Sequence, residues 1–98
     1  MINLKNKKAV ITGATGGIGY SILEKFYLEG AIVLGSGTNE EKLNKLKSDF
    51  NGTILKKFDI SKHDEIEKFV ETVCDELKGS PDILINNAGI TKDNLYLR

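Results

Sequence analysis

The sequence predicts an α/β fold in which helices cover both faces of a doubly wound parallel sheet of four strands. Short apolar runs at Ala9 to Ile11, Ile32 to Leu34 and Ile83 to Ile85 lack polar alternation, which is typical of strands buried on both faces. Thr53 to Phe58 is a weaker candidate for a fourth strand. Segments of helical length separate these runs, so strands and helices alternate along the chain.

The first helix is expected from Gly17 to Glu29, with Gly30 in the C′ position that favours glycine. A cluster of glycines, Thr12-Gly-Ala-Thr-Gly-Gly-Ile-Gly19, connects this helix to the first strand. The apolar stripe of the helix consists of Ile18, Ile22, Leu23, Phe26 and Tyr27.

A capping box, with Thr38 as the N-cap and Glu41 at N3, is expected to start the second helix, and Asn51-Gly52 ends it. Its apolar positions are Leu43, Leu46 and Phe50.

The third helix is expected to start near Ser61 and Asp64, which are candidate caps, and to run up to Gly79. Ser80-Pro81-Asp82 then turns the chain into the last strand, because proline cannot continue a helix. Its apolar positions are Ile66, Phe69, Val70, Val73, Cys74 and Leu77. Cys74 is the only cysteine, and we interpret it as a core residue.

Right-handed crossovers between parallel strands predict the spatial strand order 3-2-1-4. The first two helices then lie on one face of the sheet and the third helix on the other. The strand order reverses between strands 1 and 4, and a ligand crevice is expected at the carboxyl ends of these two strands. The glycine cluster and Asn86 to Gly89 both lie at this edge.

Composition and charge exclude several classes of function. The 98 residues suit one small domain or part of a larger one. Fourteen basic residues balance fourteen acidic ones, so neither a nucleic acid nor a membrane surface is an expected partner. The sequence shows no signal peptide or membrane-spanning run, which favours the cytoplasm. A single cysteine provides no cluster for a metal.

The glycine cluster is typical of a turn that holds a phosphate. Gly13 allows a tight turn, Gly17 allows a pyrophosphate to approach the backbone, and Gly19 allows close contact between helix and strand. The free N–H groups and the positive dipole end of the following helix would face the anion. A loop shaped only for helix packing is the alternative, and the downstream residues favour the nucleotide.

The stretch after the second strand favours NADP over NAD. An acidic side chain there would bind the ribose 2′-OH of NAD, but Gly35-Ser36-Gly37-Thr38-Asn39 carries no carboxylate. A 2′-phosphate would meet no repulsion and could accept hydrogen bonds from Thr38, Asn39 and backbone N–H groups. Thr38 can also serve only as a helix cap, and the two roles are compatible.

Two further polar stretches follow the third and fourth strands. Asp59 could accept a hydrogen bond from the adenine amino group, or it could help to cap the next helix. In Asn86-Asn87-Ala88-Gly89, the small residues allow a ligand to approach, and the amides can bind both a neighbouring strand and a ribose. A plain turn is the alternative for this second stretch.

In this order and spacing, the motifs Thr12-Gly-x-x-x-Gly17-x-Gly19, Asp59 and Asn86-Asn-Ala-Gly89 resemble the short-chain dehydrogenase/reductase family over essentially the whole chain. The segment from Asn86 to Arg98 looks like that of the bacterial 3-oxoacyl-[acyl-carrier-protein] reductases, and acetoacetyl-CoA reductases look similar. The resemblance implies a partial Rossmann fold and an NADPH-dependent reduction of acyl-carrier-protein-linked 3-oxoacyl groups in fatty-acid biosynthesis. It also implies that full-length relatives are homo-oligomers.

The resemblance further implies which residues bind the cofactor. Those expected at the pyrophosphate and its ribose are Gly13, Thr15, Gly17, Ile18 and Gly19. Thr38 is expected near the 2′-phosphate, and Asp59 with Ile60 near the adenine. Those expected along the nicotinamide-side ribose are Asn86, Ala88 and Gly89. Many NADP-dependent relatives carry an arginine where this chain has Gly16, so a charge-assisted contact to the 2′-phosphate is missing.

The same resemblance assigns no catalytic residue to this chain. In that family a serine, a Tyr-x-x-x-Lys pair and an asparagine from segments after the fourth strand perform proton transfer. Neither Tyr20 nor Tyr27 has a lysine four residues later, and for Tyr96 that position lies past residue 98. Residues 1–98 are therefore expected to form the N-terminal dinucleotide-binding portion of a reductase domain, truncated before its catalytic segment.

A second interpretation is a non-catalytic nucleotide-binding or remnant module that assembles with another chain. In a chain truncated before its catalytic segment, the strand from Ile83 to Ile85 would form an exposed apolar edge, which invites pairing with another chain, so the fragment is expected to be association-prone.

Overall fold

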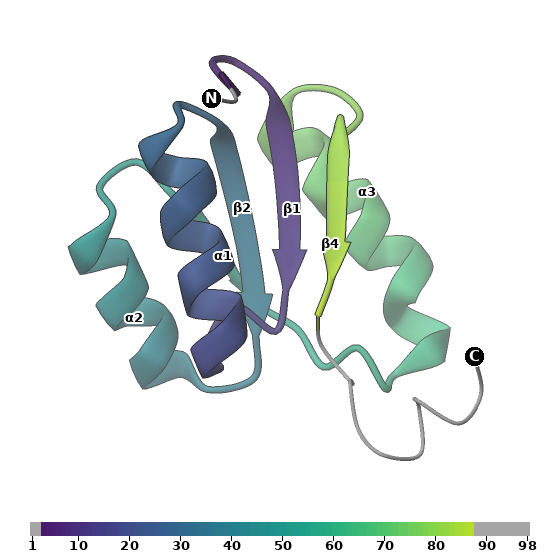
Figure 1. Ribbon diagram of the computed structural model, residues 1–98. Helices are drawn as coiled ribbons and strands as arrows, with labels where there is room; N and C mark the ends of the chain where they lie inside the picture. The colour runs from purple at the N-terminus through teal and green to yellow at the C-terminus, as the bar shows by residue number, and fades with distance from the viewer. Residues whose placement is uncertain (1–2, 88–98) are drawn as a thin grey trace, which may run out of the picture.

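The computed structural model describes residues 3–87, which form a parallel four-stranded sheet in the order β3-β2-β1-β4 (Figure 1). The predicted α/β class and strand order are confirmed. Every pair of neighbouring strands is parallel. The elements in chain order are β1 (Lys8–Thr12), α1 (Gly17–Leu28), β2 (Ile32–Gly37), α2 (Glu40–Asp49), β3 (Ile54–Lys57), the 3-10 turn η1 (His63–Glu65), α3 (Ile66–Leu77) and β4 (Ile83–Asn86).

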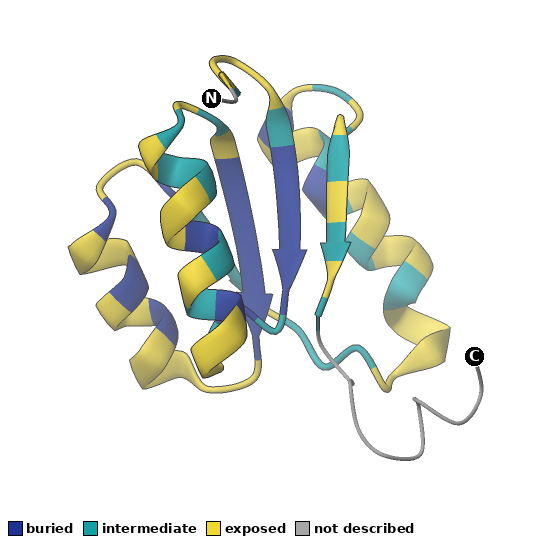
Figure 2. Cartoon of the chain, in the orientation of Figure 1, coloured by how far each residue is buried: buried dark blue, intermediate teal, exposed yellow. Residues whose placement is uncertain are grey.

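The two central strands are buried because helices cover both of their faces (Figures 1 and 2). Successive side chains of a strand point to opposite faces. Ile11 and Val33 belong to a cluster with α1 and α2, whereas Val10 and Leu34 belong to a cluster with α3. The expected placement of the first two helices on one face and the third on the other is therefore confirmed.

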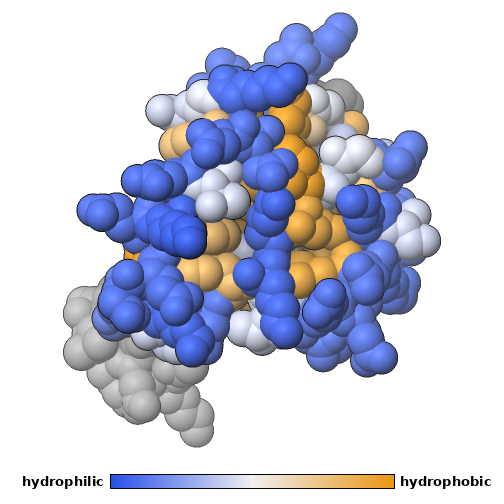
Figure 3. Space-filling model, turned by 180° about the vertical axis from the view of Figure 1, so that it is seen from behind, coloured by the Kyte–Doolittle hydropathy of each residue, from blue (hydrophilic) through white to orange (hydrophobic). Residues whose placement is uncertain are grey.

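The α1 and α2 side carries the larger core. Phe50 packs between Tyr20 and Tyr27, with ring centroids 5.4 Å and 5.2 Å apart respectively. The buried members of this cluster are Ile11, Ala14, Leu23, Val33, Leu46 and Phe50. On the other side, α3 is the only helix among the described residues, and it packs against the sheet through Val73 and Leu77. Figure 3, viewed from that side, shows hydrophobic side chains exposed between hydrophilic ones.

The apolar stripe of α1 differs from the prediction at one position. The helix ends at Leu28, and Gly30 has the positive φ of 91° expected of a C′ glycine. Ile18, however, is 70% exposed, and its assignment to the stripe is wrong. The reason is that Gly19 packs onto the glycine turn, so Gly19 and Leu23 define the buried face in this part of the helix.

The start of α2 also differs from the prediction. The N-cap is Asn39, whose Oδ1 accepts a hydrogen bond from the Lys42 N–H at 3.0 Å. The predicted capping box of Thr38 and Glu41 is therefore wrong by one residue. β2 continues to Gly37, which pairs with Lys57, and Thr38 is thereby displaced out of the helix start.

The expected caps of α3 are also wrong. A 3-10 turn precedes the helix, so neither Ser61 nor Asp64 occupies its N-cap, and Glu65 stands there without a side-chain hydrogen bond. At the other end, Lys78 takes the left-handed conformation with φ 58°.

Two apolar positions predicted for α3 are less buried than expected. Cys74 is half-buried with a free thiol, and Val70 is 51% exposed. Beside α3, Leu84 on β4 is 63% exposed. Within residues 3–87, β1 is the only strand that pairs with β4, so the other edge of β4 is open. No helix in this part of the chain is both long enough and apolar enough to span a bilayer.

Candidate functional site

The turn between β1 and α1 is held in place from three directions. Gly13 has a positive φ of 65°, and its carbonyl oxygen accepts hydrogen bonds from the Gly16 N–H at 3.3 Å and the Asn87 side-chain amide at 3.2 Å. The Ala14 N–H donates to the Ser36 carbonyl of β2 at 2.9 Å. The turn is therefore fixed by its own backbone, by β2 and by the residue that follows β4.

The first turn of α1 is open toward an outside anion. Gly16 is the N-cap without a side-chain hydrogen bond, and the first turn contains no acidic residue. A Cβ atom added at Gly17 would meet no protein atom within 4 Å. The first turn of α1 is therefore sterically open at Gly17, and the backbone N–H groups at a helix start suit a phosphate group.

Gly19 has a different role from Gly17. A Cβ atom at position 19 would collide with the carbonyl oxygen of Gly13 and would lie 2.9 Å from the Cα of Ala14. Gly19 therefore allows α1 to pack directly against the turn. Gly37 similarly leaves room for Thr15, because a Cβ there would lie 2.8 Å from the Thr15 methyl carbon.

A cleft of about 290 Å³ lies at the carboxyl ends of β1, β2 and β3. Five residues predicted to bind the cofactor line it: Gly13, Thr15, Thr38, Asp59 and Ile60. The other lining residues, which sequence reasoning did not assign to the site, are Gly37, Phe58 and Ser61. Their positions within two residues of Thr38 or Asp59 are the only sequence signal that marks them.

The carboxylate of Asp59 is fixed at this cleft by a local turn. Its Oδ1 accepts hydrogen bonds from the Ser61 hydroxyl at 2.7 Å and from the Ser61 N–H at 3.0 Å. The hydroxyl bond, then the N–H bond and the charge of Lys62 hold the pKa of Asp59 below its ordinary value. Asp59 is therefore an ionised acceptor at neutral pH and can bind an amino group.

Asn86 lies at the end of β4, opposite Thr12 of β1. The Thr12 hydroxyl donates to Asn86 Oδ1 at 3.0 Å, so the predicted bond between the asparagine and a neighbouring strand is present. Asn86 lines a second, mostly apolar cavity of about 250 Å³ on the α3 side, together with Ile60. Ala88 and Gly89 lie outside the described residues.

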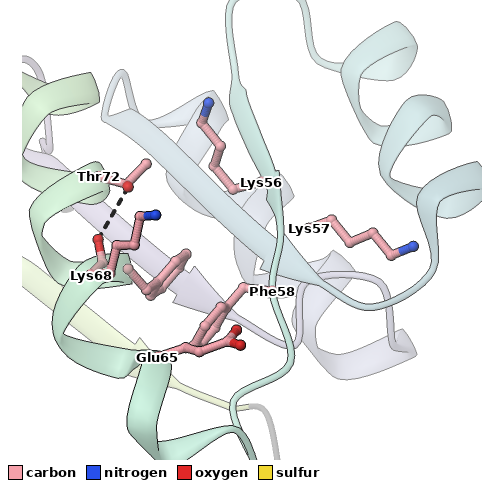
Figure 4. A pocket seen from close by; sticks show the side chains of 7 residues that line it. Lys56, Lys57, Phe58, Glu65, Lys68 and Thr72 are labelled. Atoms are coloured by element: carbon pink, nitrogen blue, oxygen red, sulfur yellow. Dashed lines mark hydrogen bonds between the residues drawn. The ribbon is translucent and has the colours of Figure 1, made fainter.

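A wider cleft of about 460 Å³ lies on the α3 side of β3 (Figure 4). Phe58 and Phe69 stack in its wall, with ring centroids 4.1 Å apart and planes 5° apart. Phe58 also lines the smaller cleft, so this stacking fixes one wall of the candidate site. The other residues that line the wider cleft come from β3, η1 and α3 and include none from the glycine turn: Lys56, Lys57, Glu65, Lys68, Phe69 and Thr72.

Within the described part of the chain, no three His, Cys, Asp or Glu side chains gather in a way that could hold a metal ion. The smaller cleft presents hydrogen-bonding groups and the carboxylate of Asp59.

The fold and this site define a class, the Rossmann-like α/β proteins with a phosphate-type turn after the first strand. The family model described as short chain dehydrogenase matches residues 7–97, and the chain belongs to this family of oxidoreductases.

Similar proteins agree with this assignment. Nodulation protein G of Rhizobium sp. (strain N33) is 43% identical over 100 residues, which cover 100% of this chain and 40% of that protein. 3-Oxoacyl-[acyl-carrier-protein] reductase FabG of Vibrio harveyi is 41% identical over 101 residues, which cover 99% of this chain and 40% of that protein. The chain thus spans about two fifths of these relatives.

Among solved structures, 2-keto-3-deoxy-D-gluconate dehydrogenase from Streptococcus agalactiae superposes with a TM-score of 0.75 at 35% identity. The superposition covers 92% of this chain and 35% of that one.

Proposed function

We propose that this chain is the cofactor-binding portion of a cytoplasmic reductase that uses NADPH to convert 3-oxoacyl-[acyl-carrier-protein] to the 3-hydroxyacyl form. The observation that carries the proposal is the cleft where the glycine turn meets Thr38 and Asp59. The name of the relative from Vibrio harveyi supports the substrate, whereas the similarly close nodulation protein G carries no substrate in its name.

The residues of the cleft, together with the start of α1 after the glycine turn, fit the parts of NADPH. The open space at Gly17 and the uncapped start of α1 suit the pyrophosphate. Because Asn39 caps α2, the Thr38 hydroxyl can donate to a 2′-phosphate. The ionised Asp59 can accept a hydrogen bond from the adenine amino group. When bound, NADPH supplies a hydride to the substrate carbonyl carbon.

These residues would bind the cofactor. The proton would come from residues that are not among the 98 of this sequence. The family resemblance attributes that proton to a tyrosine with a lysine four residues later, which this sequence lacks. The oxygen of the substrate gains this proton as the carbon gains the hydride. We therefore expect the 98-residue chain to bind NADPH without reducing a 3-oxoacyl thioester.

Titration of NADPH fluorescence with the Gly17→Ala variant tests the cofactor site. The added methyl group meets no protein atom, so the fold should persist, but it occupies the space proposed for the pyrophosphate. We expect binding to weaken by about tenfold, or about 1.4 kcal/mol. Gly16→Ala is the matched control, since its Cβ would lie 3.8 Å from the Gly13 carbonyl oxygen, an ordinary van der Waals distance. Equal NADPH binding by both variants and the unaltered chain would contradict the proposal.

An absorbance assay of NADPH oxidation tests the reaction. Acetoacetyl-acyl-carrier-protein and acetoacetyl-CoA are offered separately to the 98-residue chain and to a chimera that continues into the remaining length of the Vibrio harveyi relative. We expect turnover only by the chimera, and faster turnover with the carrier-protein thioester. Turnover by the 98-residue chain would show that the division between binding and catalysis is wrong.

The open edge of β4 favours the second candidate function, a nucleotide-binding module that assembles with another chain. Leu84 is 63% exposed on this strand, and its environment is apolar. This candidate predicts NADPH binding with no turnover even in the chimera.

A further inference from the structure

Lys57 lies at the end of β3, on the same face of the sheet as α1 and α2. Leu55, two residues earlier, packs against the core cluster of those helices, and side chains two residues apart in a strand share a face. The intervening Lys56 points to the other face, where its Nζ lies 2.8 Å from Glu76 of α3. Figure 4 shows the Lys57 side chain directed away from the group formed by Phe58, Glu65 and Lys68.

The position of Lys57 along β3 places it beside the proposed 2′-phosphate region. Its register partner on β2 is Gly37, which lines the candidate cleft and is followed directly by Thr38. The Phe58 N–H donates to the Gly37 carbonyl at 2.9 Å, so the ends of the two strands are held together.

The ion pair that Lys57 forms with Glu40 is long and exposed to solvent. The Lys57 Nζ lies 3.9 Å from Glu40 Oε1, at the outer limit of an ion pair, and the side chains are 61% and 72% exposed. A pair with this exposure contributes little stability, and a lysine has a long flexible stem. Lys57 can therefore turn toward a second anion, and it also offsets the negative charge that Glu40 places at the start of α2.

We propose that Lys57 is a specificity-determining residue that favours NADPH over NADH by supplying positive charge beside Thr38. This inference rests on the proposed function. It accounts for how the chain can accept a 2′-phosphate although Gly16 stands where many NADP-dependent relatives carry an arginine. A 2′-phosphate carries between one and two negative charges at neutral pH, whereas the 2′-hydroxyl of NADH carries none.

Calorimetric titration of the 98-residue chain with adenosine 2′,5′-bisphosphate and with 5′-AMP separates the 2′-phosphate from the rest of the nucleotide. We expect Lys57→Gln to weaken binding of the bisphosphate by about fivefold and to leave 5′-AMP within about twofold. Lys57→Arg should retain the preference, and Glu40→Gln should strengthen bisphosphate binding. Lys56→Gln is the matched control, because it removes the same charge from the opposite face of β3.

The outcomes distinguish this inference from the proposed function. Equal weakening of both nucleotides by Lys57→Gln, or no change in either, overturns the role of Lys57 while nucleotide binding stands. An equal effect of Lys56→Gln on the bisphosphate also overturns it, since any surface lysine would then suffice. Failure of the unaltered chain to bind either nucleotide contradicts the proposed function itself.

Discussion

The missing Cβ atom matters at both Gly17 and Gly19 of the glycine turn, but for different reasons. At Gly19 the missing Cβ leaves room for the carbonyl of Gly13, whereas at Gly17 it leaves room that no protein atom fills. The first reason concerns folding, and the second concerns a ligand in the proposed function. Substitutions at the two positions should therefore change different measurements.

Gly19→Ala should destabilise the fold. The added methyl group would overlap the Gly13 backbone, and overpacking of this kind costs about 1–3 kcal/mol of unfolding free energy. Urea unfolding followed by circular dichroism measures the change. Gly17→Ala, measured in the same way, should stay within about 0.5–1 kcal/mol of the unaltered chain. Equal stability of the Gly19→Ala variant and the unaltered chain would refute the close packing described for this position.

Gly16→Arg should improve NADPH binding. The backbone at Gly16 has φ −81°, which any residue adopts, and its Cβ has room. An arginine can form charge-assisted bonds with the 2′-phosphate, so we expect affinity for NADPH to rise by about tenfold and affinity for NADH to change little. Fluorescence titration with both nucleotides checks the result, and a parallel gain for NADH would argue against a 2′-phosphate at this position.

Asp59 should stabilise the fold in a pH-dependent way. Its pKa is lowered in the folded chain from an ordinary value of 3.8, so its contribution is complete above that value and disappears as the pH falls through the lower folded pKa. Asp59→Asn should therefore reduce stability at pH 7, and the difference from the unaltered chain should shrink below about pH 4. Urea unfolding at several pH values measures this difference, which would stay constant if the carboxylate were unperturbed.

At the scale of elements, the ends of strands and helices control which side chains reach the cleft. β2 extends to Gly37, so Asn39 caps α2 and Thr38 becomes part of the cleft wall. At the other end of α2, the Tyr20 hydroxyl donates to Asp49 at 2.9 Å and connects α2 to α1.

Asn39→Ala and Thr38→Ala should change different properties, the first the stability of the fold and the second the binding of NADPH. Loss of the Asn39 cap is expected to lower the unfolding free energy by about 1 kcal/mol. Loss of the Thr38 hydroxyl should leave stability nearly unchanged but weaken binding of NADPH more than binding of NADH. Urea unfolding and fluorescence titration on both variants check the division, and a larger stability loss for Thr38→Ala would restore Thr38 as the cap.

At the scale of the whole molecule, the two faces of the sheet are unequally covered. Within residues 3–87, two helices cover one face, while α3 is the only helix on the other, where Val70 and Leu84 are exposed. In the same part of the chain, the outer edge of β4 pairs with no strand, and an open edge beside an apolar surface promotes association.

Leu84→Lys should reduce self-association of the 98-residue chain, because it places a charge on the apolar edge strand. Sedimentation velocity over a range of concentrations measures the effect. Leu28→Lys is the control, since Leu28 is 69% exposed but lies at the end of α1. A chain that remains monomeric at every concentration would contradict this prediction.

Much of the fold could be predicted because local patterns specify it. Unbroken apolar runs identified the strands, the glycine cluster located the turn, and right-handed crossovers led to the strand order. The errors in helix capping occurred at element ends, where Thr38, Ser61 and Asp64 all have the side chains of caps. Which of several possible residues caps a helix depends on where the preceding strand stops pairing, and pairing is a contact between distant segments.

The sequence alone therefore determined the α/β class, the strand order and the polar residues at the sheet edge, because each follows from local composition and spacing. Only the tertiary structure decided that Gly17 faces open space and Gly19 faces Gly13, that Thr38 is released from capping, and that Lys56 and Lys57 face opposite sides. These properties depend on distances between segments far apart in the chain, and no local pattern encodes such distances.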